Sequence, residues 1–332
     1  MTINTPFTRL VGCRHPLQNA GMGTASPALG IAVAKAGALG MLSGALMSAP
    51  ALRELLSPLR AAPPGKLGIN FLVPFLEDPG AVEVAASLTD VVEFFYGDPD
   101  AGLVRRVHAG GALAAWQVGS VDEALSAEAA GCDFIIAQGV EAGGHVRGTT
   151  ALLPLLNQVL AKVKIPVLAA GGIGNARGIA AVLAMGAAGA RLGTRFVATP
   201  ESGYHPRFIE LILAARSEDT VYTEKFSGMW AAPHRVLRSC VDAVDRFQGD
   251  IVGRMQMGDQ WVDVPRCSVM GPLASATGAV EAMALYAGQS VDFVHSVQPA
   301  GDLVQELMAG AEQQLGADCL RMGSWLAGGA EG

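Results

Sequence analysis

Eight short apolar runs alternate with glycine turns and alanine-rich helical patterns through the first two-thirds of the chain. They recur at roughly 20 to 30 residues, which is the length of a strand–helix unit. Most are apolar throughout, as expected when helices cover both faces of a parallel sheet. We therefore predict an α/β fold, a closed (β/α)8 TIM barrel, with an open doubly wound sheet as the alternative. The runs are 16–18, 39–42, 67–71, 91–95, 112–118, 134–138, 166–169 and 190–192.

The pattern changes after Phe196, where charged residues become more frequent. Helical patterns at 206–215 and 234–247 predict a mainly helical subdomain at 201–269 that lies over the barrel mouth. We expect residues 1–200 and 270–332 to form the barrel, with a last helix at 302–315 packing back on it.

Composition and charge exclude several classes of protein. The 332 residues carry a net charge of −7 and few aromatic side chains, which argues against nucleic-acid binding and against binding to anionic membranes. The apolar window 28–47 contains Lys35, so a buried helix and strand are favoured over a membrane span. Five widely spaced cysteines without a Cys-x-x-Cys pair predict neither disulfides nor a metal site. With no signal-peptide pattern in residues 1–14, we expect a cytoplasmic protein.

The end of the sixth predicted strand carries the most informative motif, Gly139-Val140-Glu141-Ala142-Gly143-Gly144-His145. In a β/α barrel, functional residues gather at the carboxyl ends of strands. Glycines allow close approach of the backbone to a flat ligand, and histidine transfers protons near neutral pH. His145 is therefore a candidate catalytic residue, and a loop histidine with purely structural contacts is the alternative.

Two glycine-rich turns follow the seventh and eighth predicted strands, at 170–174 and 193–194. Exposed amides and a helix N-terminus at such turns hold a phosphate, and Thr194 adds a hydroxyl. The first turn does not complete a dinucleotide fingerprint, because Arg177 stands at the third glycine position. Three amides also lie at strand ends, where they suit the polar edge of an isoalloxazine ring or satisfy loop backbone: Asn19, Asn70 and Gln117.

These segments resemble the nitronate monooxygenase family, formerly called 2-nitropropane dioxygenases, which are FMN-dependent barrel enzymes. The resemblance covers nearly the whole chain. Its glycine–histidine motif is specific to this group and its close relatives, whereas the glycine turns occur in many FMN barrels. Asn19 and Gly21 depart from the Gln and Pro that are usual there. The resemblance is carried by residues 18–22, 68–71, 138–145, 170–173, 192–196 and 286–290.

The resemblance implies a role for each matching residue. His145 is the base that deprotonates a nitroalkane or orients the bound anion. Asn70 and Gln117 bond the flavin ring or its ribityl chain, and Gly143 lies under the ring. The other implied contacts are Ala20, Gly21, Met22 and Gly144 along the flavin, and Ala170, Gly171, Gly172, Gly193 and Thr194 at its phosphate.

The implied reaction is oxidation of an alkyl nitronate by O2 to a carbonyl compound and nitrite, with FMN as cofactor and without metal or NAD(P)H. The chain would act on a small molecule as a monomer or homodimer. One alternative is an FMN-dependent NAD(P)H-using reductase of enoyl-acyl-carrier-protein or quinones, and another is a flavin-binding protein without turnover. Arg147 either attracts an anionic substrate or is solvated. The substrate wall is expected to come from Tyr204, Met229, Trp230 and His234.

Overall fold

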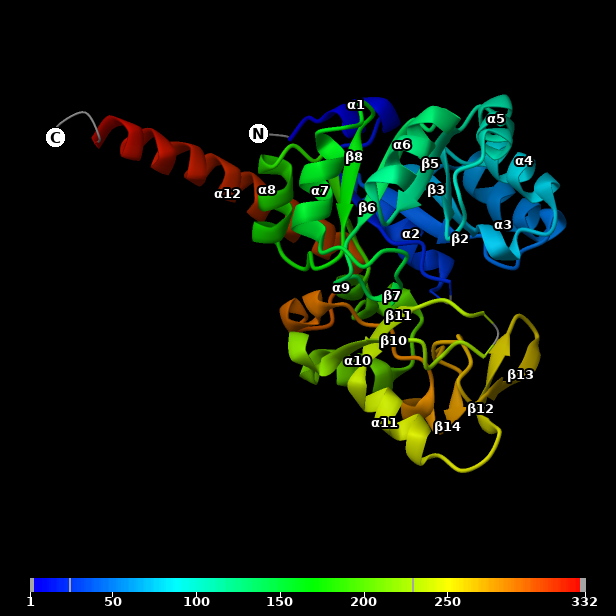
Figure 1. Cartoon of the computed structure of the whole chain (residues 1–332). Helices are drawn as coiled ribbons and strands as arrows, with labels where there is room; N and C mark the ends of the chain where they lie inside the picture. The colour runs from blue at the N-terminus through cyan, green and yellow to red at the C-terminus, as the bar shows by residue number, and fades with distance from the viewer. Residues whose placement is uncertain (1–2, 24, 229, 329–332) are drawn as a thin grey trace.

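The structure is a computed structural model that describes residues 3–23, 25–228 and 230–328, with side chains up to residue 316. Eight parallel strands close into a barrel in the order β1-β2-β3-β4-β5-β6-β8-β9, which confirms the predicted TIM barrel (Figure 1). Each strand coincides with one of the eight apolar runs. Their bounds are β1 Leu17–Asn19, β2 Leu39–Ser43, β3 Lys66–Leu72, β4 Val91–Phe95, β5 Leu113–Val118, β6 Phe134–Gln138, β8 Val167–Ala170 and β9 Gly189–Leu192.

Helices surround the barrel and begin where the sequence supplies caps. Ser120 accepts a hydrogen bond from the Glu123 amide at the start of α6, and Asn175 accepts one from Gly178 at the start of α8. The barrel helices are α2 Pro27–Lys35, α3 Ala49–Ala61, α4 Pro79–Leu88, α5 Ala101–Gly110, α6 Val121–Ala130, α7 Leu152–Leu160 and α8 Ala176–Ala184, with short helices η1 Val73–Phe75 and α9 Thr194–Val197.

The long C-terminal helix α12, Ala300–Gly328, completes the ring of helices. Leu303, Val304 and Leu307 are buried in the main barrel core, as predicted for a helix that packs back on the barrel. Its second half extends away from the body of the molecule (Figure 1). None of the helices in the described ranges is long and apolar enough to cross a membrane.

An apolar plug closes the amino-terminal end of the barrel. Helix α1, Pro6–Val11, inserts Phe7 against Phe134 of β6, with ring centroids 5.3 Å apart in an edge-on arrangement. Met41, Val91 and Leu168 complete this buried layer. The amino-terminal half of the barrel is thus a packed core, and any ligand must enter from the carboxyl ends of the strands.

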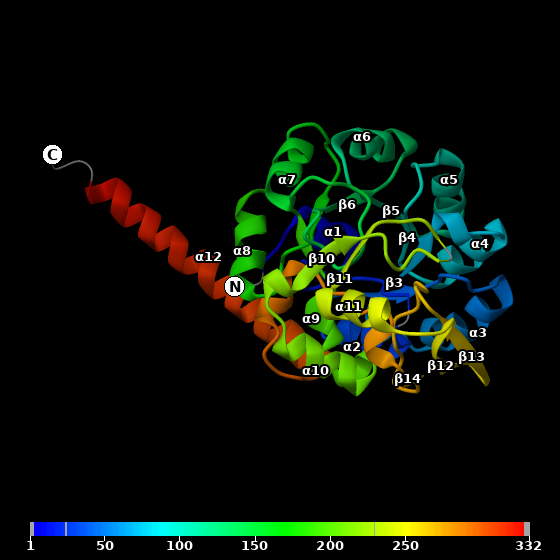
Figure 2. The same ribbon diagram turned by 60° about the horizontal axis from the view of Figure 1, so that its bottom comes forward.

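Residues 197–294 form a second hydrophobic core over that end, here called the cap (Figure 2). It contains α10 Pro206–Ala214, β10 Thr220–Thr223, β11 His234–Leu237, α11 Arg238–Arg246, β12 Ile251–Met257, β13 Gln260–Pro265 and β14 Thr277–Gly278, with short helices η2 Pro200–Ser202, η3 Ser217–Asp219, η4 Val280–Ala282 and η5 Gln289–Phe293.

Two expectations about the cap are corrected. The segment 201–269 is not mainly helical, because β10 to β13 account for about as much of it as α10 and α11. Residues 234–237 are a strand because β11 pairs with β10 on one side and with β7, Gly144–His145, on the other. Tertiary pairing outweighs the local helical pattern there. Residues 276–294 also pack in the cap core rather than in the barrel.

Candidate active site

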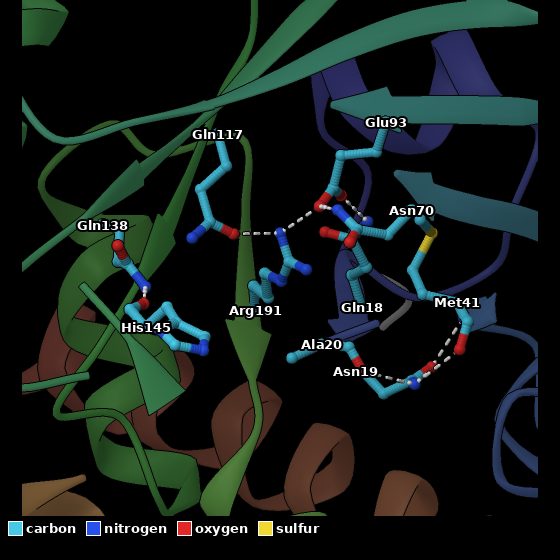
Figure 3. Close-up of polar contacts among 10 residues, drawn as sticks. All are labelled: Gln18, Asn19, Ala20, Met41, Asn70, Glu93, Gln117, Gln138, His145 and Arg191. Atoms are coloured by element: carbon cyan, nitrogen blue, oxygen red, sulfur yellow. Dashed lines mark hydrogen bonds and ion pairs between the residues drawn. The ribbon is translucent and has the colours of Figure 1, made fainter. Parts of the chain in front are cut away.

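The backbone of His145 is held between the barrel and the cap, and Figure 3 shows its contact with Gln138 on the barrel side. Gln138, at the end of β6, donates from Nε2 to the His145 carbonyl oxygen at 2.9 Å and accepts from the Arg147 amide at 3.2 Å. On the other side, His145 pairs with His234 of β11. The Val146 amide donates to the Pro233 carbonyl oxygen at 3.0 Å. The motif predicted from its glycines is therefore the junction at which the cap meets the barrel mouth.

Aromatic rings surround the His145 imidazole. The centroid of the Trp230 ring lies 4.3 Å away, that of Tyr286 5.5 Å, that of His234 5.6 Å and that of Tyr96 6.1 Å. Tyr96 adopts a left-handed backbone with φ 66°, which is uncommon for a non-glycine residue. The imidazole is thus largely enclosed by rings, although His145, Tyr96 and Trp230 each stay partly exposed.

The nitrogen atoms of His145 have few partners. Tyr286 Oη lies 3.5 Å from Nε2, and its own proton is donated to the Val269 carbonyl oxygen at 2.8 Å. Nδ1 is buried and makes no hydrogen bond of normal geometry among the described residues, although the nearby Ala232 and Pro233 carbonyl oxygens partly oppose the lowering of the His145 pKa. Burial, reinforced by the proximity of His234, lowers the pKa of His145 to about 3. The ring is therefore neutral at pH 7 and has an unpartnered nitrogen atom available.

We predict that His145 makes the stability of the apoprotein depend on pH. Its pKa is about 3 in the folded chain, whereas an unfolded histidine titrates near ~6.5. Between these values the unfolded state binds one more proton, so stability falls as pH falls. Relative to His145→Asn, the wild type should lose about 1.4 kcal/mol per pH unit between about pH 6 and 4.5. Urea unfolding of both proteins measures this difference, and parallel pH profiles would contradict it.

Other residues of the expected substrate wall fall into different environments. His234 is fully buried, with Nδ1 2.9 Å from the Ala232 carbonyl oxygen and Nε2 accepting from the Phe226 amide at 3.1 Å. It supports the cap although it lies beside His145. Tyr204 packs in the cap core against Phe208, with ring centroids 5.3 Å apart. Trp230 borders the imidazole, and Met229 lies outside the described residues.

A buried polar network occupies the barrel interior at the carboxyl ends of the strands (Figure 3). Glu93 is fully buried and accepts from Gln18 Nε2 at 3.0 Å, Asn70 Nδ2 at 2.7 Å and Arg191 Nη1 at 2.6 Å. The same Arg191 nitrogen donates to Gln117 Oε1 at 2.5 Å. The structure thus joins the two predicted ring-contact amides, Asn70 and Gln117, through one ion pair.

Sequence reasoning missed Glu93 and Arg191, although a signal was present. Each is a lone charge inside an apolar strand, and buried charges are almost always paired. Asn19, by contrast, hydrogen-bonds to backbone, which was the alternative to a flavin contact. Its amide donates to the Met41 carbonyl oxygen at 3.0 Å and accepts from the Met41 amide at 2.8 Å, which supports the short β1–β2 pairing.

The glycine turns after β8 and β9 lie at the same end of the barrel. Gly171 and Gly172 have φ values of 99° and 69°, and within the described ranges the amides of Gly172 and Ile173 have no acceptor. Thr194 Oγ1 accepts from the Gly288 amide at 3.0 Å, which leaves its own proton free to donate. A Cβ on Gly193 would lie 3.4 Å from Ala20 Cβ. The ends of β1 and β9 therefore converge beside these amides.

The paired glycines before His145 have different surroundings. A Cβ on Gly143 would lie 2.4 Å from the Gly288 amide nitrogen, so its close approach is to the cap backbone. Gly144 has φ 79° and no atom within 4 Å of its Cβ position, so the open space lies at Gly144. Gly21 approaches Asn70, with 2.6 Å between the two Cβ positions.

We predict that Gly143→Ala lowers the free energy of unfolding by about 1–3 kcal/mol, because backbone rather than a mobile side chain blocks the new methyl group. Gly316→Ala is the matched control. Gly316 lies exposed in α12 with no atom within 4 Å, and alanine there should stabilise the helix by up to about 1 kcal/mol. Chemical unfolding measures both variants. Equal stability of Gly143→Ala and the wild type would contradict the contact.

Arg147 is paired with two carboxylates. Its Nε lies 2.6 Å from Glu123 Oε1 and its Nη2 2.7 Å from Asp98 Oδ1, while the guanidinium lies over the Tyr96 ring at 5.5 Å. Its charge is thus neutralised locally and supports Tyr96. No group of three or more metal-ligating side chains occurs in the part of the chain that the structure describes.

Comparison with known proteins identifies the group to which this barrel and capped mouth belong. The sequence model of the nitronate monooxygenase family matches residues 77–310. The chain belongs to the nitronate monooxygenase family. It is accordingly an oxidoreductase enzyme.

Proteins similar to this chain bear different names. The nitronate monooxygenase of Pseudomonas aeruginosa is 30% identical and aligns with 91% of this chain and 97% of its own. The (3aS,4S,5R,7aS)-5-hydroxy-7a-methyl-1-oxo-octahydro-1H-indene-4-carboxyl-CoA dehydrogenase of Rhodococcus jostii is 36% identical over 72% of this chain and 67% of its own.

Solved structures of similar proteins show the same fold. FabK of Thermotoga maritima has a TM-score of 0.78 at 30% identity, covering 96% of this chain and 99% of its own. The nitroalkane oxidase of Streptomyces ansochromogenes has a TM-score of 0.72 at 28% identity, covering 94% and 100%.

Proposed function

We propose that this family member binds FMN at the barrel mouth and oxidises alkyl nitronates with O2 to carbonyl compounds and nitrite. The observation that carries the proposal is the neutral His145, enclosed by aromatic rings at the strand ends where glycine turns leave amides without acceptors.

Several features of the mouth fit FMN. The unpartnered amides of Gly172 and Ile173 and the Thr194 hydroxyl suit a phosphate group. No atom lies within 4 Å of a Cβ position on Gly144, so the backbone beside His145 is open on that side. We assign the phosphate to Ala170, Gly171, Gly172, Gly193 and Thr194, the ring edge to Asn70 and Gln117, and the ring wall to Ala20, Gly21, Met22, Gly143 and Gly144. Bound FMN would supply the electron acceptor.

His145 handles the proton in this proposal. A base with a pKa of about 3 removes a proton from a neutral nitroalkane slowly, because catalytic efficiency is highest when the pKa lies near the working pH. The nitronate anion needs no such step, and the neutral imidazole can donate a hydrogen bond to its oxygen. Trp230 and Tyr96 lie against the imidazole and limit the access of water to it. The site therefore favours nitronates over nitroalkanes.

A second candidate is a flavin-dependent oxidoreductase that acts on an acyl thioester. It is supported by the 36% identity to a CoA dehydrogenase and the 30% identity to FabK.

Two assays on the FMN-loaded protein distinguish the candidates. Ionised nitropropane in air should yield nitrite, at a higher rate than neutral nitropropane at the same pH. NADH under anaerobic conditions should leave the flavin absorbance unchanged over the same time. Rapid bleaching by NADH, with no nitrite from the nitronate, would reject nitronate oxidation and support the second candidate.

A further inference from the structure

The Glu93–Arg191 ion pair dictates how the amides around it are oriented. A carboxylate can only accept hydrogen bonds, so Asn70 and Gln18 must both turn their NH2 groups toward Glu93. A guanidinium can only donate, so Gln117 must turn its carbonyl oxygen toward Arg191. None of these three amides can rotate by 180° without placing a donor against a donor or an acceptor against an acceptor.

The same constraint determines which polar atoms remain free. Asn70 keeps Oδ1 as an acceptor, Gln117 keeps Nε2 as a donor, and Arg191 keeps Nε and Nη2 as donors. None of these atoms has a partner among the described side chains and backbone. They are not sealed from solvent either, in contrast to Gln18 Oε1, which is buried without a partner. The floor of the mouth therefore presents one acceptor and several donors to a ligand.

This pattern complements the edge of an imide ring, which has one N–H donor flanked by two carbonyl acceptors. In the flavin ring this edge is N3–H between the C2 and C4 carbonyls. We propose that the Glu93–Arg191 pair is a positioning pair that presents Asn70 Oδ1 to N3–H of the flavin, and the Gln117 and Arg191 donors to the neighbouring carbonyl oxygens and N1. The inference rests on the proposed FMN cofactor and adds the orientation of its ring.

The pair also acts on the charge of the ring. Reduction of FMN by two electrons and one proton places a negative charge at N1 and the C2 carbonyl oxygen. The Arg191 guanidinium, which is 6% exposed, stabilises that charge with little screening by water. Glu93, fully buried at 2.6 Å from Arg191, opposes it. The two residues should therefore shift the affinity for reduced FMN in opposite directions.

Charge variants of the pair provide the test. Glu93→Gln should fold, because the unpartnered Gln18 Oε1 can accept from the new amide. The ratio of its affinity for reduced FMN to its affinity for oxidised FMN should be about tenfold higher than in the wild type. This change raises the two-electron potential of the bound flavin by about 30 mV. In Glu93→Gln/Arg191→Gln, the ratio of the affinity for reduced FMN to that for oxidised FMN should be about tenfold lower than in Glu93→Gln alone. Arg207→Gln is the control: it removes an exposed, paired charge on α10 and should leave both FMN affinities and the flavin potential unchanged.

The measurements are binding titrations with FMN and anaerobic potential titrations with dithionite. They add two analogues: N3-methyl FMN, which lacks the donor for Asn70 and should bind at least about tenfold more weakly, and uridine monophosphate, which carries an imide edge without the flavin rings. Equal ratios in all variants, full affinity for N3-methyl FMN, or tighter binding of uridine monophosphate than of FMN would overturn the inference. Failure of the wild type to bind FMN would instead reject the proposed function.

Discussion

His145→Asn is expected to lower the rate with a neutral nitroalkane by about 10²-fold, the low end of the range for general bases because the pKa of His145 lies far below the working pH, while FMN stays bound. Asparagine retains hydrogen-bonding capacity but cannot accept the substrate proton. The rate with the corresponding nitronate should fall less, because its proton has already been removed. Steady-state nitrite formation from both substrates measures the two effects.

His205→Asn is the matched control. Its side chain accepts from the Arg207 amide at the start of α10, and asparagine is also a good N-cap, so activity should be unchanged. An equal loss with nitroalkane and nitronate in His145→Asn would contradict a role in proton removal. Full retention of both activities would exclude His145 from catalysis.

Arg191→Met is expected to lower the free energy of unfolding of the apoprotein by about 3–5 kcal/mol. The substitution leaves the Glu93 carboxylate, which is fully buried, without its positive partner. Glu93→Gln/Arg191→Met removes both charges and should recover most of the loss. Urea unfolding followed by tryptophan fluorescence compares the three proteins. Equal loss in the single and double variants would show that packing, and not the ion pair, dominates.

The barrel could be predicted from the sequence because its signals are local. Apolar runs such as Phe134–Gln138 and caps such as Ser120 act over a few neighbouring residues. Each of the eight barrel strands overlaps one of the predicted apolar runs. The histidine motif could be identified for the same reason, because its glycines and imidazole are contiguous.

The cap and the pairing of charges in the polar network could not be predicted, because they depend on contacts between distant segments. β11 becomes a strand only through pairing with β10 and with His145. Glu93 and Arg191 lie in different strands, and the sequence of neither strand indicates which residue its charged side chain pairs with. The structural role of Asn19 likewise depends on Met41 in the neighbouring strand.

The most direct measurement is a titration of the apoprotein with FMN, followed by quenching of flavin fluorescence and by visible absorbance. We predict saturation at one FMN per chain, with riboflavin binding more weakly because it lacks the phosphate held by the turns after β8 and β9. Absence of saturable binding, or equal affinity for riboflavin and FMN, would contradict a flavin site at the barrel mouth with its phosphate at those turns.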